Sequence, residues 1–272
     1  MEKAYAKINL FLNVKNKRED NYHELEMINV EIDLFDEMTF TLIEEDKIEI
    51  IIHKANIKLE DNLIYKVARY LKEKCLIKQG IRIDVIKNIP LGSGLAGGSS
   101  DAAKTIEMLN ILWMLGLTKE EMSFIGKKFG ADIPFFFQHE PCYIKGIGDI
   151  IAPVSLNLKD YNIYLFNPEI NVSTKLIFES IKKEEYDLKP IEKCLNVLND
   201  DKLFVAEMFN TLENVTKREY TEVNNLINDL HKKYPKEKIM MSGSGGSVFI
   251  ITKNELNIRK NTKHFLRKCR IV

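Results

Sequence analysis

A run of small residues between positions 90 and 103 constrains this chain most. It reads PLGSGLAGGSSDAA and lies between a strand-like segment, residues 81–89, and a helix-like segment, residues 99–115. The start of a helix presents unpaired backbone N–H groups and the positive end of the helix dipole. The four glycines exceed what a turn or a cap requires, and they allow a ligand to approach the backbone closely. The stretch therefore predicts an anion site, with phosphate as the natural ligand.

Two well-known phosphate loops do not fit this stretch. GSGLAG, residues 92–97, satisfies the G-x-G-x-x-G pattern, but residues 88–90 separate it from the strand. The region about 20 residues later, where a dinucleotide fold needs an acidic residue after a second strand, looks helical. The P-loop spacing is also present, but Gly98 stands where that motif has its lysine. A dinucleotide-dependent oxidoreductase is thus disfavoured, and Ser99 and Ser100 add hydroxyls that can cap the helix, bind phosphate or ligate Mg²⁺.

Composition excludes several classes of protein. The 272 residues carry 40 basic and 40 acidic side chains, and a balanced charge argues against a general nucleic-acid partner. Cys75, Cys142, Cys194 and Cys269 form no C-x-x-C pair, so we expect neither zinc nor disulfides. Thiols suit a reducing compartment, and residues 1–20 are too polar for a signal peptide or a membrane span. We expect a cytoplasmic protein without a membrane partner.

Hydrophobic periodicity predicts alternating strands and helices. Thr118 and Glu121 form a capping-box pattern, and Gly130 is a plausible end for that helix. The order has no regular βαβ spacing, so we predict an α+β chain in two parts with a boundary near residue 150. The expected strands are 6–14, 24–34, 37–43, 47–54, 81–89 and 161–168, with short strand-like pieces at 132–137 and 142–148, and two strands around a second glycine turn within 238–252. The expected helices are 61–75, 99–115, 118–130, 173–183, 190–200, 222–234 and 255–269.

The glycine stretch resembles the phosphate motif of the GHMP kinases, P-x-x-x-G-L-x-G/S-S-S/A. Four more motifs of that family occur before and after it in the expected order, so the resemblance spans nearly the whole chain. It implies a two-domain fold: a ribosomal protein S5 domain 2-like, ATP-binding domain over 1–150 and a ferredoxin-like, substrate-side domain over 151–272. It also implies ATP and Mg²⁺ as cofactors and a small-molecule acceptor, a cytidine diphosphate sugar alcohol of isoprenoid precursor synthesis, with the enzyme a monomer or a homodimer. The other motifs are YAKINLFLNV with NYHELEMI near the start, GADIPFFF in the middle and MSGSGGSVFI near the end.

The resemblance implies catalytic roles for two residues, Asp132 and Lys7, whose local sequence patterns do not by themselves indicate catalysis. Asp132, followed by Ile-Pro, is by itself good turn chemistry, and Lys7 in an apolar strand is by itself an edge lysine reaching water. By resemblance Asp132 is the general base, and Lys7 keeps it ionised and polarises the acceptor hydroxyl. The nucleotide residues implied are Pro90, Gly92, Gly94, Leu95, Ala96, Gly97, Gly98, Ser99, Ser100 and Asn62.

The acceptor residues are also implied by resemblance. Tyr22 would stack on cytosine and His23 would bond its edge, while Phe178 would add a second ring, although its pattern alone reads as a core aromatic. Asn62 and Thr174 read equally well as helix caps. The full set implied is Asn9, Tyr22, His23, Thr174, Phe178, Gly243 and Gly245.

Departures from the family pattern keep alternatives open. Asn21 replaces a usual glycine, residues 138–143 read QHEPCY where glycines are common, and Asp149 replaces glutamate. Asn tolerates a positive φ, so the turn at residue 21 can survive. The alternatives are a GHMP kinase acting on another small alcohol and a nucleotide-binding relative without turnover.

Overall fold

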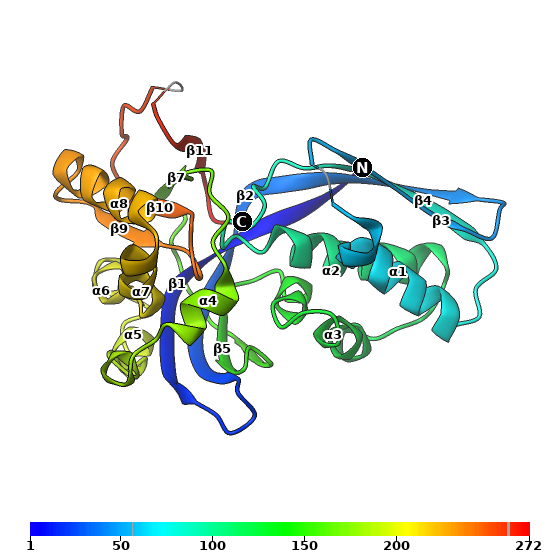
Figure 1. The fold of residues 1–272 in the computed structure, drawn as a ribbon, viewed down its shortest axis with the longest axis horizontal. Helices are drawn as coiled ribbons and strands as arrows, with labels where there is room; N and C mark the ends of the chain where they lie inside the picture. Colours follow the sequence, from blue (N-terminus) through cyan, green and yellow to red (C-terminus); the bar gives the residue numbers. More distant parts are fainter. Residues whose placement is uncertain (56, 260–261) are drawn as a thin grey trace. The chain divides into compact units, whose positions relative to one another are not determined.

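The computed structural model describes residues 1–55, 57–259 and 262–272, and these residues form two compact units (Figure 1). The first unit holds residues 1–6, 34–89 and 96–139, and the second holds residues 7–33, 90–95 and 140–272. Strands β1 (Glu2–Lys17) and β2 (His23–Ile43) contribute residues to both. The family division at residue 150 remains a prediction; the compact units group the chain differently.

The first unit is a small sheet with helices. Strand β4 (Gly80–Ile86) pairs antiparallel with β2, so that Glu37 lies opposite Ile86, and pairs parallel with β3 (Ile48–His53). The parallel pair needs a crossover, which α1 (Leu63–Lys74) supplies. Helix α1 packs on α2, and η2 packs on both α2 and α3. The remaining elements of this unit are η1 (Leu59–Asp61), α2 (Gly97–Leu112), α3 (Lys119–Lys127) and η2 (Ile133–Phe137).

The second unit contains a four-stranded antiparallel sheet in the order β11-β7-β10-β9. Every residue of β7 (Asn162–Phe166) and β10 (Val248–Thr252) is buried, which places these two central strands in the core. The other strands are β9 (Lys238–Met241), β11 (Phe265–Cys269), β5 (Cys142–Gly146), β6 (Ile150–Pro153) and β8 (Phe209–Asn210). The helices are α4 (Thr174–Glu179), η3 (Lys183–Glu185), α5 (Glu192–Leu195), α6 (Asp201–Glu207), α7 (Leu212–Glu219) and α8 (Thr221–Lys233).

Local signals for two helix starts are confirmed, whereas α3 ends at Lys127 rather than at the predicted Gly130. Thr118 accepts from the backbone of Glu121, whose side chain bonds back to the backbone of Thr118, so the capping box is complete. Asn62 caps α1, because its Oδ1 atom accepts from the backbone N of Ile64 at 2.9 Å. Five apolar residues of α1 recur at helical spacing: Ile64, Val67, Ala68 and Leu71 are buried, and Leu63 is half-buried.

Two predicted elements and one predicted break between strands are wrong. Residues 132–137 form the 3₁₀ helix η2 rather than a strand; short apolar runs do not distinguish the two. Residues 265–269 form β11 because β7 offers a free edge for pairing, whereas helical spacing predicted a helix over 255–269; residues 260–261 lie outside the described residues. The predicted break between residues 34 and 37 does not occur, since β2 continues through Asp36.

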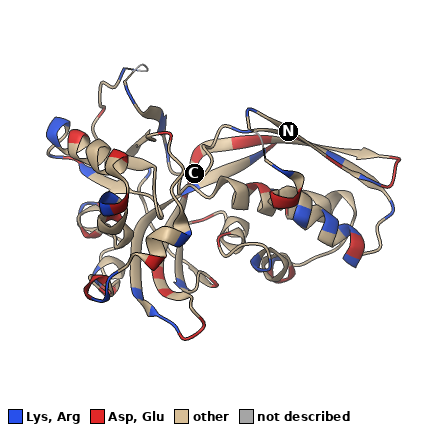
Figure 2. Ribbon diagram, in the orientation of Figure 1, with Lys and Arg blue, Asp and Glu red and all other residues tan. Residues whose placement is uncertain are grey.

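Charge is dispersed along the chain. Figure 2 shows basic and acidic residues on the same elements, α1 among them, as the equal numbers of the two kinds suggest. All four cysteines are thiols rather than disulfides. A search of residues 1–55, 57–259 and 262–272 finds no helix with the length and apolar character needed to cross a membrane.

Candidate functional site

The second half of the glycine stretch lies in the first unit and starts helix α2. The N-cap residue of α2 is Ala96, whose φ is 56°. Alanine has no polar side chain, so it cannot cap the helix with a side-chain hydrogen bond. A Cβ placed on Gly97 would lie 2.9 Å from the side chain of Ile89, so a larger residue does not fit there. Among residues 1–55, 57–259 and 262–272, a Cβ on Gly98 would meet only Leu63, at 3.9 Å. The first turn thus keeps uncapped backbone donors next to free space at Gly98, an arrangement suited to an anion.

Asp132 belongs to the same unit. It occupies the N-cap position of η2 but makes no capping hydrogen bond with its side chain, and it is half-buried. Two residues earlier, a Cβ on Gly130 would lie 3.8 Å from Oγ of Ser99, so this turn borders the start of α2. Asp132 therefore does not act as a side-chain cap of η2.

A buried ion cluster that the sequence analysis missed lies beside the glycine stretch. Lys87 bonds Asp36 and, at 2.5 Å, Asp101; all three side chains are almost fully buried. Burial and the nearby Asp36 raise the pKa of Asp101 to about 7, although the Lys87 ammonium acts in the opposite direction. The signal available in the sequence was a pair of charged residues on either side of the glycines: Lys87, three residues before Pro90, and Asp101, three residues after Gly98.

The first half of the glycine stretch, residues 90–95, is packed within the second unit against the second glycine turn. Gly94 has φ of +76°, and a Cβ there would lie 2.3 Å from the backbone oxygen of Ser242. Oγ of Ser242 donates to the carbonyl of Gly94 at 3.1 Å, and the N–H of Ser247 donates to the carbonyl of Ser93 at 3.0 Å. The two glycine turns predicted separately therefore lie backbone against backbone, and only glycine fits at position 94.

Lys7 and Asn9 lie on one face of β1, as their spacing predicts. Both are buried, and Nζ of Lys7 donates to Oδ1 of Asn9 at 2.7 Å. The amide of Asn9 donates to Oδ1 of Asn29 at 2.7 Å, so Asn9 is held from both sides. The backbone N of Lys7 donates to the carbonyl of Leu95 at 3.0 Å, which joins β1 to the glycine loop. Asn29 is a further buried polar residue of this cluster, and the sequence analysis missed it.

His23 lies in an aromatic cluster. Its ring contacts Phe178, with centroids 5.0 Å apart, and stacks near Tyr186, with Nε2 of His23 3.3 Å from the Tyr186 hydroxyl. Burial lowers the pKa of His23, and the nearby Lys17 charge adds to this, so the ring is neutral at pH 7. Tyr22 is 62% exposed. The structure thus joins His23 and Phe178 as predicted and adds Tyr186, which no sequence pattern singled out.

The other acceptor-side residues are joined to the second glycine turn. The hydroxyls of Thr174 and Ser244 lie 2.9 Å apart. Gly243 and Gly245 both have positive φ, and a Cβ on Gly243 would lie 3.5 Å from Oδ1 of Asn9. The cap of α4 is Ser173, not Thr174, so that alternative reading of Thr174 is wrong. Asn21 adopts φ of 67°, which confirms that the turn before Tyr22 needs the left-handed conformation.

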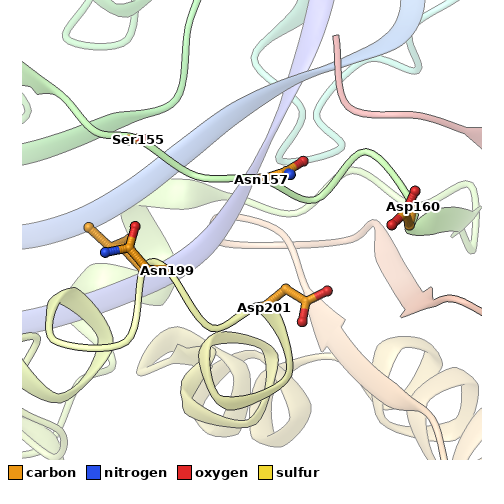
Figure 3. A pocket seen from close by; sticks show the side chains of 6 residues that line it. Ser155, Asn157, Asp160, Asn199 and Asp201 are labelled. Carbon is orange, nitrogen blue, oxygen red and sulfur yellow. The ribbon is translucent and has the colours of Figure 1, made fainter.

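A small polar cavity of about 170 Å³ lies elsewhere in the second unit (Figure 3). None of the predicted site residues lines it. Its lining residues are Ser155, Asn157, Asp160, Leu198, Asn199 and Asp201.

Comparison with known proteins gives a consistent result. The GHMP kinases N terminal domain matches residues 62–140, and the GHMP kinases C terminal domain matches residues 183–261. A 4-diphosphocytidyl-2-C-methyl-D-erythritol kinase of Clostridioides difficile is 38% identical over 98% of this chain and 91% of its own length. One of the same name from Caldicellulosiruptor bescii is 37% identical over 95% and 91%.

Among solved structures, a 4-(cytidine 5'-diphospho)-2C-methyl-D-erythritol kinase matches with a TM-score of 0.77 and 27% identity, covering 92% of this chain and 89% of that one. The match confirms the predicted α+β, two-domain fold class. The chain therefore belongs to the GHMP kinases and, within them, to the family of the 4-diphosphocytidyl-2-C-methyl-D-erythritol kinases.

Proposed function

We propose that this chain transfers the γ-phosphoryl group of ATP to the 2-hydroxyl of 4-diphosphocytidyl-2-C-methyl-D-erythritol. The observation that carries the proposal is the glycine stretch. Helix α2 begins within it after Ala96, without a side-chain cap, and the carbonyl of Leu95 accepts from the backbone N of Lys7. Backbone N–H groups at a helix start favour phosphate oxygens. The names of the family members support the choice of acceptor.

In the proposed reaction the acceptor oxygen attacks the γ-phosphorus while the bond to the β,γ-bridging oxygen breaks. Asp132 accepts the hydroxyl proton, and ADP leaves with the electrons of the broken bond. The Lys7 ammonium, oriented by Asn9, would stabilise charge on the reacting oxygens. The pairing of Lys7 with Asp132 is part of the proposal.

Mg²⁺ is proposed to enter with the nucleotide. Ser99 and Ser100, in the first turn of α2, offer the oxygen ligands that Mg²⁺ accepts beside phosphates and water. The described residues hold no group of three or more acidic, histidine or cysteine side chains suited to a metal, which agrees with an ion held mainly by the nucleotide. When bound, the ion would neutralise charge on the β- and γ-phosphates.

The cytidine end is assigned to the cluster of His23, Phe178 and Tyr186 with the exposed Tyr22. A neutral His23 offers one donor and one acceptor to a base edge, and the exposed ring of Tyr22 offers a stacking surface. Acceptors such as homoserine or mevalonate have no base, so they would leave this aromatic cluster unused.

ADP release from Mg-ATP with the proposed acceptor tests the function, with CMP titration as a separate measurement. We expect turnover that depends on the acceptor, and CMP binding that is lost in His23→Ala. Turnover with another alcohol and no CMP binding would reassign the acceptor. ATP binding without turnover on any alcohol would favour a nucleotide-binding relative.

A further inference from the structure

The buried Lys87 cluster connects the two ends of the phosphate loop within the first unit. Before the loop, the carboxylate of Asp36 accepts from the backbone N of Asn88, at 2.5 Å, and of Ile89, at 2.8 Å. These two residues directly precede Pro90. The chain leading into the loop is therefore fixed by one carboxylate of β2.

The chain leaving the loop is fixed to the same cluster. Asp101 lies one turn into α2, and its Oδ2 accepts from Nζ of Lys87 at 2.5 Å. A Cβ on Gly97, the first residue of α2, would lie 2.9 Å from Ile89, so the two ends are also packed together without room for a side chain. Lys87 thus ties Asp36 on one side to Asp101 on the other.

Because the cluster is buried, each of its charges needs a partner within the protein. Asp36 is fully buried between the buried apolar residues Leu34 and Met38 of the same strand face, so its charge must be satisfied inside the protein. It receives the ammonium and two backbone N–H groups, which is close to the capacity of a carboxylate. This explains why β2 continues through an acidic residue that predicted a break.

We propose that Asp36, Lys87 and Asp101 are positioning residues for the nucleotide: they fix the distance between the two ends of the phosphate loop and hold its N–H groups in the phosphate-binding conformation. The proposal rests on the proposed function, because it assumes that the loop binds ATP. A loop with loose ends must be ordered when ATP binds, and that ordering lowers the affinity.

Two variants test the two ends. Asp36→Asn keeps the shape but replaces one acceptor oxygen with an amide, so the backbone of residues 88–89 or Lys87 loses a partner. Asp101→Ala frees α2 from Lys87 and leaves a balanced Lys87–Asp36 pair, which favours folding. Asp84→Asn on β4 is the matched control, because among the described residues the Asp84 carboxylate bonds only the exposed side chain of Arg82.

The first measurement is ATP affinity by calorimetry, without acceptor, beside the KM values for ATP and acceptor. We expect Asp36→Asn to weaken ATP binding on the order of 10-fold, as for one lost charge-assisted hydrogen bond, and Asp101→Ala to weaken it several-fold. The acceptor KM should stay within about 2-fold of the parent. Asp84→Asn should match the parent throughout.

Hydrogen exchange gives the second measurement. The amides of residues 88 and 89 should lose protection in Asp36→Asn and keep it in Asp84→Asn. Parent-like ATP affinity in both Asp36→Asn and Asp101→Ala, or equal losses for ATP and acceptor, would overturn the proposal. If the parent protein binds no ATP, the proposed function itself is refuted. If the parent binds ATP but shows no turnover, the ATP affinities of the variants still test the positioning role.

Discussion

Gly94→Ala should damage the contact between the two glycine turns. Gly94 has φ of +76°, and a Cβ there would lie 2.3 Å from the carbonyl oxygen of Ser242 and 2.8 Å from that of Gly245. Both neighbours are backbone atoms, so no side-chain rotation relieves the overlap. The positive φ costs about 1–2 kcal/mol for alanine, and overpacking adds about 1–3 kcal/mol.

Gly116→Ala is the matched control. Gly116 has φ of +67°, but a Cβ there meets none of the residues that the structure describes within 4 Å, so its cost should be the backbone term alone, about 1–2 kcal/mol. We therefore expect Gly94→Ala to lower the free energy of unfolding by about 2–5 kcal/mol, measured by urea denaturation, and to weaken ATP binding. Equal losses of stability in the two variants, with ATP affinity unchanged, would refute the reasoning that the turns act through this contact.

Three further predictions concern the phosphate loop, the ion cluster and the aromatic cluster. Gly98→Ala should stabilise α2 by up to about 1 kcal/mol, since only Leu63 lies near the new methyl, yet calorimetry should show weaker ATP binding because that methyl stands where phosphate is proposed. Since the pKa of Asp101 is raised to about 7, above the unfolded value, its contribution to stability falls as pH rises from about 4 to 7. In urea denaturation, the free energy of unfolding of Asp101→Asn minus that of the parent should therefore increase between about pH 4 and 7 and stay level above about pH 7. A difference that does not change with pH would contradict this. Tyr186→Phe removes the hydroxyl beside His23, so CMP titration should show binding weakened about 3- to 10-fold, whereas parent-like binding would exclude that role.

Much of the fold follows from local sequence signals. The apolar spacing of α1, the capping box at Thr118 and the need for a left-handed residue at Asn21 are short-range features that read directly from the chain. The two errors of element type, at η2 and β11, have different causes: the short apolar run of η2 fits a strand as well as a helix, whereas β11 depends on a partner far away in sequence. Phe265–Cys269 becomes a strand because β7 pairs with it, which periodicity alone does not reveal.

The candidate site shows the same division. The glycine stretch is a local pattern that indicated an anion site by itself, whereas Lys7 and Asn9 were singled out by the family resemblance. Asp36, Asn29 and Tyr186 were missed because each gains its role from a residue that is distant in the chain: Asp36 meets Lys87 51 positions later, and Tyr186 meets His23 163 positions earlier. A polar residue in an apolar strand, as at Asp36 and Asn29, was the only hint available.

The most direct test of the central claim is ADP release from Mg-ATP with 4-diphosphocytidyl-2-C-methyl-D-erythritol, comparing the parent with Asp132→Asn and with Asp84→Asn as control. We predict acceptor-dependent turnover by the parent and the control, and a fall in kcat of about 10²–10⁴ in Asp132→Asn with ATP affinity kept. Normal turnover by Asp132→Asn would contradict the assignment of the base, and a parent that binds ATP but leaves this acceptor unphosphorylated would contradict the proposed function.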